Sequence, residues 1–254
     1  MDLDALRYGN FAKLGEAITD WQQMVNRLSH LKEVAERDLR AKANRADWAG
    51  VNAAVSREFI AKTAGEFSDA HTQANTTVKI LSDTRNELTD FRTQINTAIE
   101  NGLKKDLAVT DTGGGSFTVS PRVHPVLATA EQPSQRDVDT VRDEVQRILN
   151  KATESDKTAA EALRLIVDQA KYGFSDASYS DRDSAADAVK AGKASAALAK
   201  RGRDISPEQL KKLNHQIRKY RNDDLFSEKF AESMGAKGTL QFWADITDSN
   251  SGTP

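Results

Sequence analysis

The stretch FAKLGEAITDWQQMVNRL, residues 11–28, decides the fold of this chain. Its large apolar residues follow one another at gaps of alternately three and four positions, which is the period of a coiled-coil seam and not of a β-strand. The members of this first seam are Phe11, Leu14, Ile18, Trp21, Val25 and Leu28. The seam is extended by Leu3, Leu6, Leu31, Val34, Ala35 and Leu39. We therefore predict an amphipathic helix that begins near residue 3 or residue 11 and ends near residue 44.

A second seam covers residues 51–103, and no proline interrupts residues 1–120. A helix of about fifty residues would be ~75 Å long, and such a helix is stable only when its apolar seam is covered. The first helix can cover it after a short turn. We predict a long antiparallel helical hairpin over residues 1–104 and an all-α fold. The members of the second seam are Val51, Val55, Phe59, Phe67, Ala74, Val78, Leu81, Leu88, Phe91, Ile95, Ile99 and Leu103.

The turn of the hairpin must fall between the two seams, in the stretch ANRADWAG at residues 43–50. Asn44 and Asp47 favour turns and helix caps because their side chains bond to nearby backbone groups. Gly50 supplies backbone freedom at the same place. We expect Trp48 to lay its indole ring over the open end of the hairpin, where the seam runs out.

Trp48-Ala49-Gly50 is a Trp-x-Gly tripeptide between two matched seams. This arrangement resembles the WXG family of small helical-hairpin proteins, which ESX, or type VII, secretion systems of actinobacteria and firmicutes export. The surrounding sequence KANRADWAGVNA also resembles larger actinobacterial secretion-associated proteins built on such a hairpin. The resemblance covers residues 1–104. It implies packing against a helical protein partner or a second copy of the chain, and export without a cleaved signal peptide.

The resemblance implies a non-enzymatic protein–protein interaction module, either a type VII secretion substrate or the leader module of a larger secreted effector. A secretion ATPase is a further candidate partner. The hairpin-turn motif consists of Trp48 and Gly50. The partner-packing candidates are Phe11, Leu14, Ile18, Trp21, Val25, Leu28, Phe59, Phe67, Leu81 and Leu88.

Substrates of this family often carry a Tyr-x-x-x-Asp/Glu export signal just beyond the second helix, and nothing near residues 100–115 fits that pattern. Aromatic packing beside solvated carboxylates explains the later matches equally well, and the missing signal is a departure from the family pattern. The later matches are Tyr172 with Asp176, Tyr179 with Asp183, and Tyr220 with Asp224.

The stretch LAVTDTGGGSFTVS, residues 107–120, differs from its surroundings. Two β-rich runs flank a glycine-rich turn, which predicts a small β-hairpin within residues 105–133. No Lys-Ser or Lys-Thr pair follows the glycines, so a phosphate-binding loop is disfavoured. An isolated two-stranded hairpin is marginal in water, and we expect it to lean on nearby helices. Pro121 and Pro125 begin a loop or linker.

Residues 134–246 predict a C-terminal helical region, followed by a flexible tail at residues 247–254. A long helix begins near Ser134, with Ser134 or Asp137 as its candidate cap, and a polar stretch at 153–157 can bend or divide it. An alanine-rich helix at 184–200 has few large apolar anchors. Three shorter elements follow, with Ser206 and Pro207 starting the first, Asp223 or Asp224 the second, and Gly235 ending the second. Phe242 and Trp243 cannot share one face of the last helix, so one of them is a candidate exposed aromatic.

Composition excludes several functional classes. Hydrophobic residues make up 38% of the chain and the net charge is −2, which suits solvated amphipathic helices and not bulk nucleic-acid binding. The chain has no cysteine, so disulfides and thiol chemistry are absent. Its acidic start lacks a signal-peptide pattern, and no apolar run approaches the roughly 20 residues of a membrane span. We expect synthesis in the cytoplasm, no membrane insertion, and any export to be independent of a signal peptide.

No catalytic motif stands out, and we predict no catalytic residues, metal ligands or cofactors. The histidines lack a second ligand at metal spacing, and no Gly-x-Ser-x-Gly, His-Glu-x-x-His or P-loop sequence occurs. Two alternatives stay open: a cytoplasmic helical scaffold or adaptor unrelated to secretion, and a toxin or hydrolase with its site in the C-terminal half. The histidines are His30, His71, His124 and His215.

Overall fold

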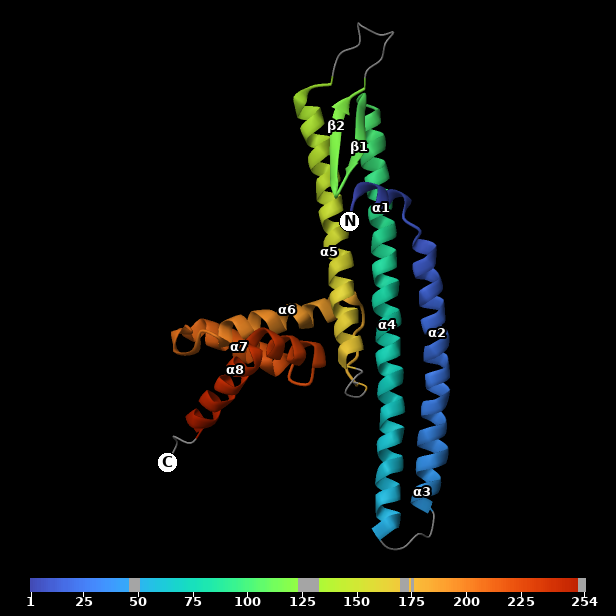
Figure 1. The fold of residues 1–254 in the computed structure, drawn as a ribbon, viewed down its shortest axis with the longest axis vertical. Helices are drawn as coiled ribbons and strands as arrows, with labels where there is room; N and C mark the ends of the chain where they lie inside the picture. Colours follow the sequence, from blue (N-terminus) through green and yellow to red (C-terminus); the bar gives the residue numbers. More distant parts are fainter. Residues whose placement is uncertain (46–50, 123–132, 170–173, 175, 251–254) are drawn as a thin grey trace. The chain divides into compact units, whose positions relative to one another are not determined.

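The protein is described by a computed structural model that covers residues 1–45, 51–122, 133–169, 174 and 176–250 (Figure 1). Within these ranges the chain is mainly helical and carries one two-stranded antiparallel sheet. This confirms the predicted all-α fold with a small β-hairpin. In this part of the chain, no helix is both long enough and apolar enough to cross a membrane.

The packing divides the chain into two compact units, each described by itself below. The long helix α4, Val51–Leu103, contributes residues to both units. The division therefore cuts across the hairpin predicted over residues 1–104 and does not follow its boundary. Unit 1 consists of Met1–Thr19 and Leu81–Ala160, and unit 2 consists of Asp20–Ile80 and Glu161–Pro254.

The first arm of the hairpin contains several helical segments where the seam spacing predicts one helix. A break at Gly9 and Asn10 separates α1 from α2, so both predicted starting points, residues 3 and 11, are helix starts. A π-helical stretch, η1, then changes the hydrogen-bond pattern before a last short turn. The seam spacing does not predict this change. The segments are α1 (Leu3–Tyr8), α2 (Phe11–Glu33), η1 (Val34–Arg40) and α3 (Ala41–Arg45).

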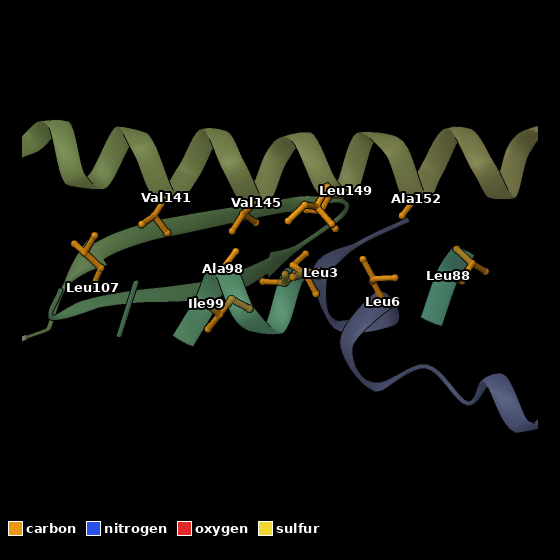
Figure 2. Packing of buried hydrophobic residues seen from close by; sticks show 12 residues of the cluster. Leu3, Leu6, Leu88, Ala98, Ile99, Leu107, Val141, Val145, Leu149 and Ala152 are labelled. Atoms are coloured by element: carbon orange, nitrogen blue, oxygen red, sulfur yellow. The ribbon is translucent and has the colours of Figure 1, made fainter. Parts of the chain in front are cut away.

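The core of unit 1 is a layer of apolar side chains between α4 and α5, the latter spanning Gln135–Gln169. The α5 residues recur at helical spacing, which places them on one face. Figure 2 shows Leu3 and Leu6 of α1 lying between the α4 and α5 residues. The cluster consists of Leu3, Leu6, Leu88, Ile95, Ala98, Ile99, Leu107, Val141, Val145, Ile148, Leu149 and Ala152.

The predicted β-hairpin is formed by β1 (Leu107–Gly113) and β2 (Ser116–Pro121). Gly113, Gly114 and Gly115 all have positive φ, a backbone region that glycine enters without steric penalty. Leu107 is fully buried, and the other inward residues pack against the core of unit 1, as expected for a hairpin that needs helical support. These inward residues are Val109, Phe117 and Val119.

Helix α5 begins as the sequence predicts. The Asp137 backbone N–H donates to Ser134 Oγ at 3.2 Å, so Ser134 caps the helix. Bonds from Ser134 and Lys105 in turn hold the pKa of the Asp137 carboxyl at about 2. The polar stretch 153–157 does not divide the helix, and α5 runs unbroken to Gln169.

Two of the C-terminal helices of unit 2 begin with a capping box, and the sequence predicts the cap at Ser206. Asp181 forms a capping box with Ser184, and Ser206 forms one with Gln209. Helix α8 contains a non-helical residue, Gly235, at the position where the sequence predicts one helix to end. It continues to Asn250, into the segment predicted as a flexible tail. The elements are α6 (Arg182–Ala199), η2 (Gly202–Asp204), α7 (Pro207–Lys219) and α8 (Asp224–Asn250).

Helices α6 and α8 pack closely although α6 has few large side chains. Its buried face consists mainly of small residues, and a Cβ at Gly192 would lie only 2.7 Å from the Phe226 carbonyl oxygen. Small residues let two backbones approach, so dense packing replaces large anchors. On α8, Phe226 stacks on Tyr220 with ring centroids 5.3 Å apart and on Phe230 at 6.0 Å.

Candidate interaction surface

The two arms of the hairpin run antiparallel in unit 2. Arg57 Nε on α4 donates to the Ala43 carbonyl oxygen on α3 at 3.2 Å, and these residues are equally far along the chain from residue 50. Burial raises the pKa of the Asp69 carboxyl, and the negative charges of Asp176 and Glu66 raise it further. Lys32 on α2 lies close enough to Asp69 to oppose this rise. The pairing is therefore centred on residue 50, in the segment predicted as the turn.

The turn motif itself, Trp48 and Gly50, lies outside the described residues. The flanking helices α3 and α4 end and begin at Arg45 and Val51, which brackets the predicted turn. The lid function expected for the Trp48 ring stays a prediction.

Several large apolar side chains on the unit 2 part of the hairpin face solvent. Phe59 is 69% exposed and Val55 is 60% exposed, and their spacing of four places them on one face of α4. Met24 and Leu31, seven positions apart, likewise share one face of α2. We call this set the hairpin apolar surface. It consists of Met24, Leu31, Leu39, Val55 and Phe59.

Charged residues accompany this surface. Arg37 on η1 forms ion pairs with Glu33 at 2.7 Å and with Asp38 at 3.7 Å, and all three side chains are largely exposed. Exposed pairs of this kind add about 0–1 kcal/mol to stability. Asp38 directly precedes Leu39 of the hairpin apolar surface in the sequence, and Arg37 lies two positions before it.

Most of the partner-packing candidates are buried or partly buried within the chain. Val25 and Leu88 are buried, and Phe59 is the candidate that lies well exposed. The extended seams place Leu31, Leu39 and Val55 against the other arm, and the structure corrects this because all three are exposed. The candidates that are partly buried are Phe11, Leu14, Ile18, Trp21, Leu28, Phe67 and Leu81.

Met24 is a member of the surface that the seam analysis misses. It precedes the buried seam residue Val25 by one position, which on a helix turns it about 100° away from the seam. A period of three and four cannot identify such a residue, because it lies outside the repeat. The signal in the sequence is a large apolar residue at a position outside the seam, where polar residues are expected.

Unit 1 contains an open groove between α2 and α4 with a volume of about 590 Å³. Ile18 lines it together with Glu16 and Arg85, which carry opposite charges. A Cβ at Gly15 would lie 3.3 Å from Arg85 Nε, so the absence of a side chain at Gly15 leaves room for the guanidinium. The mixed charges do not select a class of ligand.

The candidate export-signal pairs do not form one helical motif. Tyr172 lies outside the described residues, and its partner Asp176 is exposed. Tyr220 is the C-cap of α7, while Asp224 begins α8, so a turn separates them. The half-buried Tyr220 ring stacks on Phe226.

Tyr179 is buried, which makes its match with Asp183 unsuitable as a recognition signal. Its hydroxyl donates to Asp223 Oδ1 at 2.8 Å and accepts from the Leu225 backbone N–H at 3.4 Å. Burial, with the nearby Asp223 carboxylate, raises the pKa of Tyr179 far above its ordinary value. This side chain fastens the segment before α6 to the start of α8.

The predicted exposed aromatics are Phe242 and Trp243. Phe242 is partly buried and packs edge-on against Phe230, with ring centroids 5.4 Å apart. The Trp243 side chain lies outside the described part of the structure. Phe242 therefore belongs to the aromatic packing of α8.

A cluster of charges joins α5, α6 and α8 in unit 2. Glu161 pairs with Lys193 Nζ at 2.6 Å and with Lys229 Nζ at 3.1 Å, and Lys229 also pairs with Glu232. Burial alone would raise the pKa of Glu161, but the hydrogen bonds from Lys193 and Lys229 outweigh it and lower this pKa. Both lysines are used in these pairs, so the cluster fits a structural role.

The three described histidines lie on three different helices. His30 on α2 and His215 on α7 are exposed, and His71 on α4 is partly buried. His124 lies outside the described ranges.

Comparison with known proteins gives no relative: no protein-family model, no curated protein and no solved structure matches this chain. The likeness to the WXG family therefore depends on the sequence features around Trp48.

Proposed function

We propose that this chain is a non-enzymatic protein–protein interaction module that acts by helix packing, as a type VII secretion substrate or as the leader module of a larger secreted effector. Its partner is a helical protein that covers the hairpin apolar surface. A secretion ATPase is the second partner in this proposal.

The exposed apolar side chains of the hairpin carry the proposal. Full burial of one large apolar side chain contributes about 1.5–3 kcal/mol, so leaving Phe59 and Val55 in water forgoes a substantial stabilisation. Single exposed apolar residues are common on protein surfaces, whereas same-face pairs on both α2 and α4 provide the anchors that a packed helix needs. The antiparallel pairing centred on residue 50 supports the likeness to WXG hairpins.

The test compares Val55→Asp with Val167→Asp in the full chain. Val167 on α5 is 61% exposed and Val55 is 60% exposed, so the two variants introduce the same charge at matched positions. Each tagged variant is isolated from the native host, and co-purified proteins are quantified by mass spectrometry. We expect Val55→Asp and Phe59→Asp to lose a small helical partner at least about tenfold, while Val167→Asp retains it. Equal recovery by all variants would refute a role for the hairpin apolar surface.

Export is measured separately. The chain is followed in culture filtrate and cells of the native host, with a cytoplasmic protein as the lysis control. Inactivating the secretion ATPase should abolish its appearance in the filtrate. A chain that stays in the cells of the unmodified host while still binding its helical partner would be a cytoplasmic scaffold instead.

A further inference from the structure

The short helix α1 packs against residues of α4, α5 and β1 in unit 1, and we call the site that receives it the α1 groove. Leu3 and Leu6 are almost completely buried among residues of α4, α5 and β1 (Figure 2). A helix of six residues has little stability of its own. Its structure therefore depends on the groove that receives it.

Polar contacts hold both ends of α1 in this groove. At its start, the Asp4 backbone N–H donates to Asp111 Oδ2 on β1 at 2.9 Å. At its end, the Arg92 guanidinium on α4 donates to the Leu6 carbonyl oxygen at 3.3 Å and also to that of Gly9. These groups satisfy backbone atoms that a helix terminus leaves without intrahelical partners. All of them come from segments distant in sequence.

The covalent link between α1 and α2 is a sharp hinge. The Gly9 N–H still bonds to the Ala5 carbonyl oxygen, and Asn10 then starts α2 by accepting from the Ala12 N–H at 3.1 Å. A Cβ at position 9 would collide with the Ala5 carbonyl oxygen. The link between α1 and α2 therefore requires glycine at residue 9 in this conformation.

We propose that the groove is also the docking site for α1 of a second copy of this chain, so that two copies associate by exchanging residues 1–8. The same contacts can be made between two copies as within one, namely those of Leu3, Leu6, Asp111 and Arg92. The free energies of the exchanged dimer and the closed monomer therefore differ only through the hinge and through the translational and rotational freedom lost on association. A short tether keeps the effective concentration of α1 in the millimolar range, which favours the closed monomer in dilute solution. This contact is distinct from the hairpin apolar surface and does not depend on the proposed function.

The hinge provides the test. Gly9→Ala places a methyl group against the Ala5 carbonyl oxygen and favours a continuous helix through residues 9 and 10, so it penalises the closed monomer. The matched control is Gly65→Ala on α4, where a Cβ would meet nothing within 4 Å. Light scattering coupled to size-exclusion chromatography should show a dimer constant at least about tenfold tighter for Gly9→Ala than for the control. Adding Leu6→Asp to Gly9→Ala should abolish that dimer.

Cross-linking identifies the contact. The chain has no cysteine, so Arg7→Cys and Asn96→Cys can be placed on separate copies with tags of different size. Arg7 Nε lies 3.3 Å from Asn96 Oδ1 within one copy, and a short bismaleimide will join the two copies only when α1 has been exchanged. The cross-linked product should rise with protein concentration in the otherwise unchanged chain and should be stronger with Gly9→Ala.

Three results would overturn the proposal: a Gly9→Ala protein that stays monomeric, a dimer that gives no product between the two cysteine variants, or a dimer that survives Leu6→Asp. If Gly9→Ala fails to fold, the mixed cysteine variants decide alone. Absence of their product up to about 1 mM protein, the range of the effective concentration, would then rule the exchange out.

Discussion

Replacing Gly192 with alanine tests the packing of unit 2 at its α6–α8 crossing. The new Cβ would lie 2.7 Å from the Phe226 carbonyl oxygen and 3.1 Å from Lys229 Cβ. The first of these atoms belongs to the backbone of α8, so it cannot rotate away and one helix must shift. Overpacking of this kind costs about 1–3 kcal/mol.

Alanine also gains helix propensity over glycine, by about 0.5–1 kcal/mol. The expected net result for Gly192→Ala is a loss of up to about 2.5 kcal/mol in the free energy of unfolding, with a central value of about 1 kcal/mol. Gly65→Ala isolates the propensity gain, because nothing lies within 4 Å of a Cβ at that position. Its unfolding free energy should rise by up to about 1 kcal/mol.

The two variants are compared by urea unfolding followed by far-UV circular dichroism. Hydrogen exchange of the α8 amides near Phe226 then shows whether the loss is localised to the crossing. Gly192→Ala should accelerate exchange there, and Gly65→Ala should not. Equal stabilisation of both variants would refute the argument that α6 and α8 are in backbone contact at Gly192.

Two further predictions concern polar groups of unit 2. Tyr179→Phe removes the hydrogen bond to Asp223 and should lower the free energy of unfolding by about 1–3 kcal/mol in urea titrations, since bonds to charged acceptors are the stronger ones; an unchanged midpoint would contradict this. The pKa of Glu161 is lowered in the folded chain, so its ion pairs stabilise the folded state at any pH above the ordinary carboxyl pKa. This contribution is lost as the pH falls through the pKa that Glu161 has in the folded chain. Glu161→Gln should therefore reduce the stability difference between neutral and acidic solution, and an identical pH profile would show that Lys193 and Lys229 add nothing.

The seams and caps show how far local sequence rules reach. Alternating gaps predict the antiparallel hairpin because covering an apolar stripe is the main driving force for a long helix. Ser206 and Ser134 cap helices as predicted, because an orphan N–H needs a nearby acceptor. Gly235 marks the break in α8 for a similar local reason, its freedom at positive φ.

The sequence predicts the tertiary contacts less well than the local elements. The spacing of Leu31, Leu39 and Val55 identifies apolar faces, but spacing cannot say whether the second arm or another protein covers them. The alanine-rich helix α6 lacks large anchors in sequence, and its close approach to α8 becomes visible only when both helices are placed. The packing of α1 against α4, α5 and β1 depends on Arg92 and Asp111, which are remote from α1 along the chain.

Both compact units are assembled from segments that are discontinuous in sequence. The polypeptide passes from one unit to the other after Thr19, after Ile80 and after Ala160. No single cut can therefore release either unit intact, and a fragment ending at residue 104 would leave Ile95 and Ile99 without the α5 residues that cover them. A truncated chain would expose part of its apolar core to solvent, so point substitutions in the full chain are the appropriate way to study this protein.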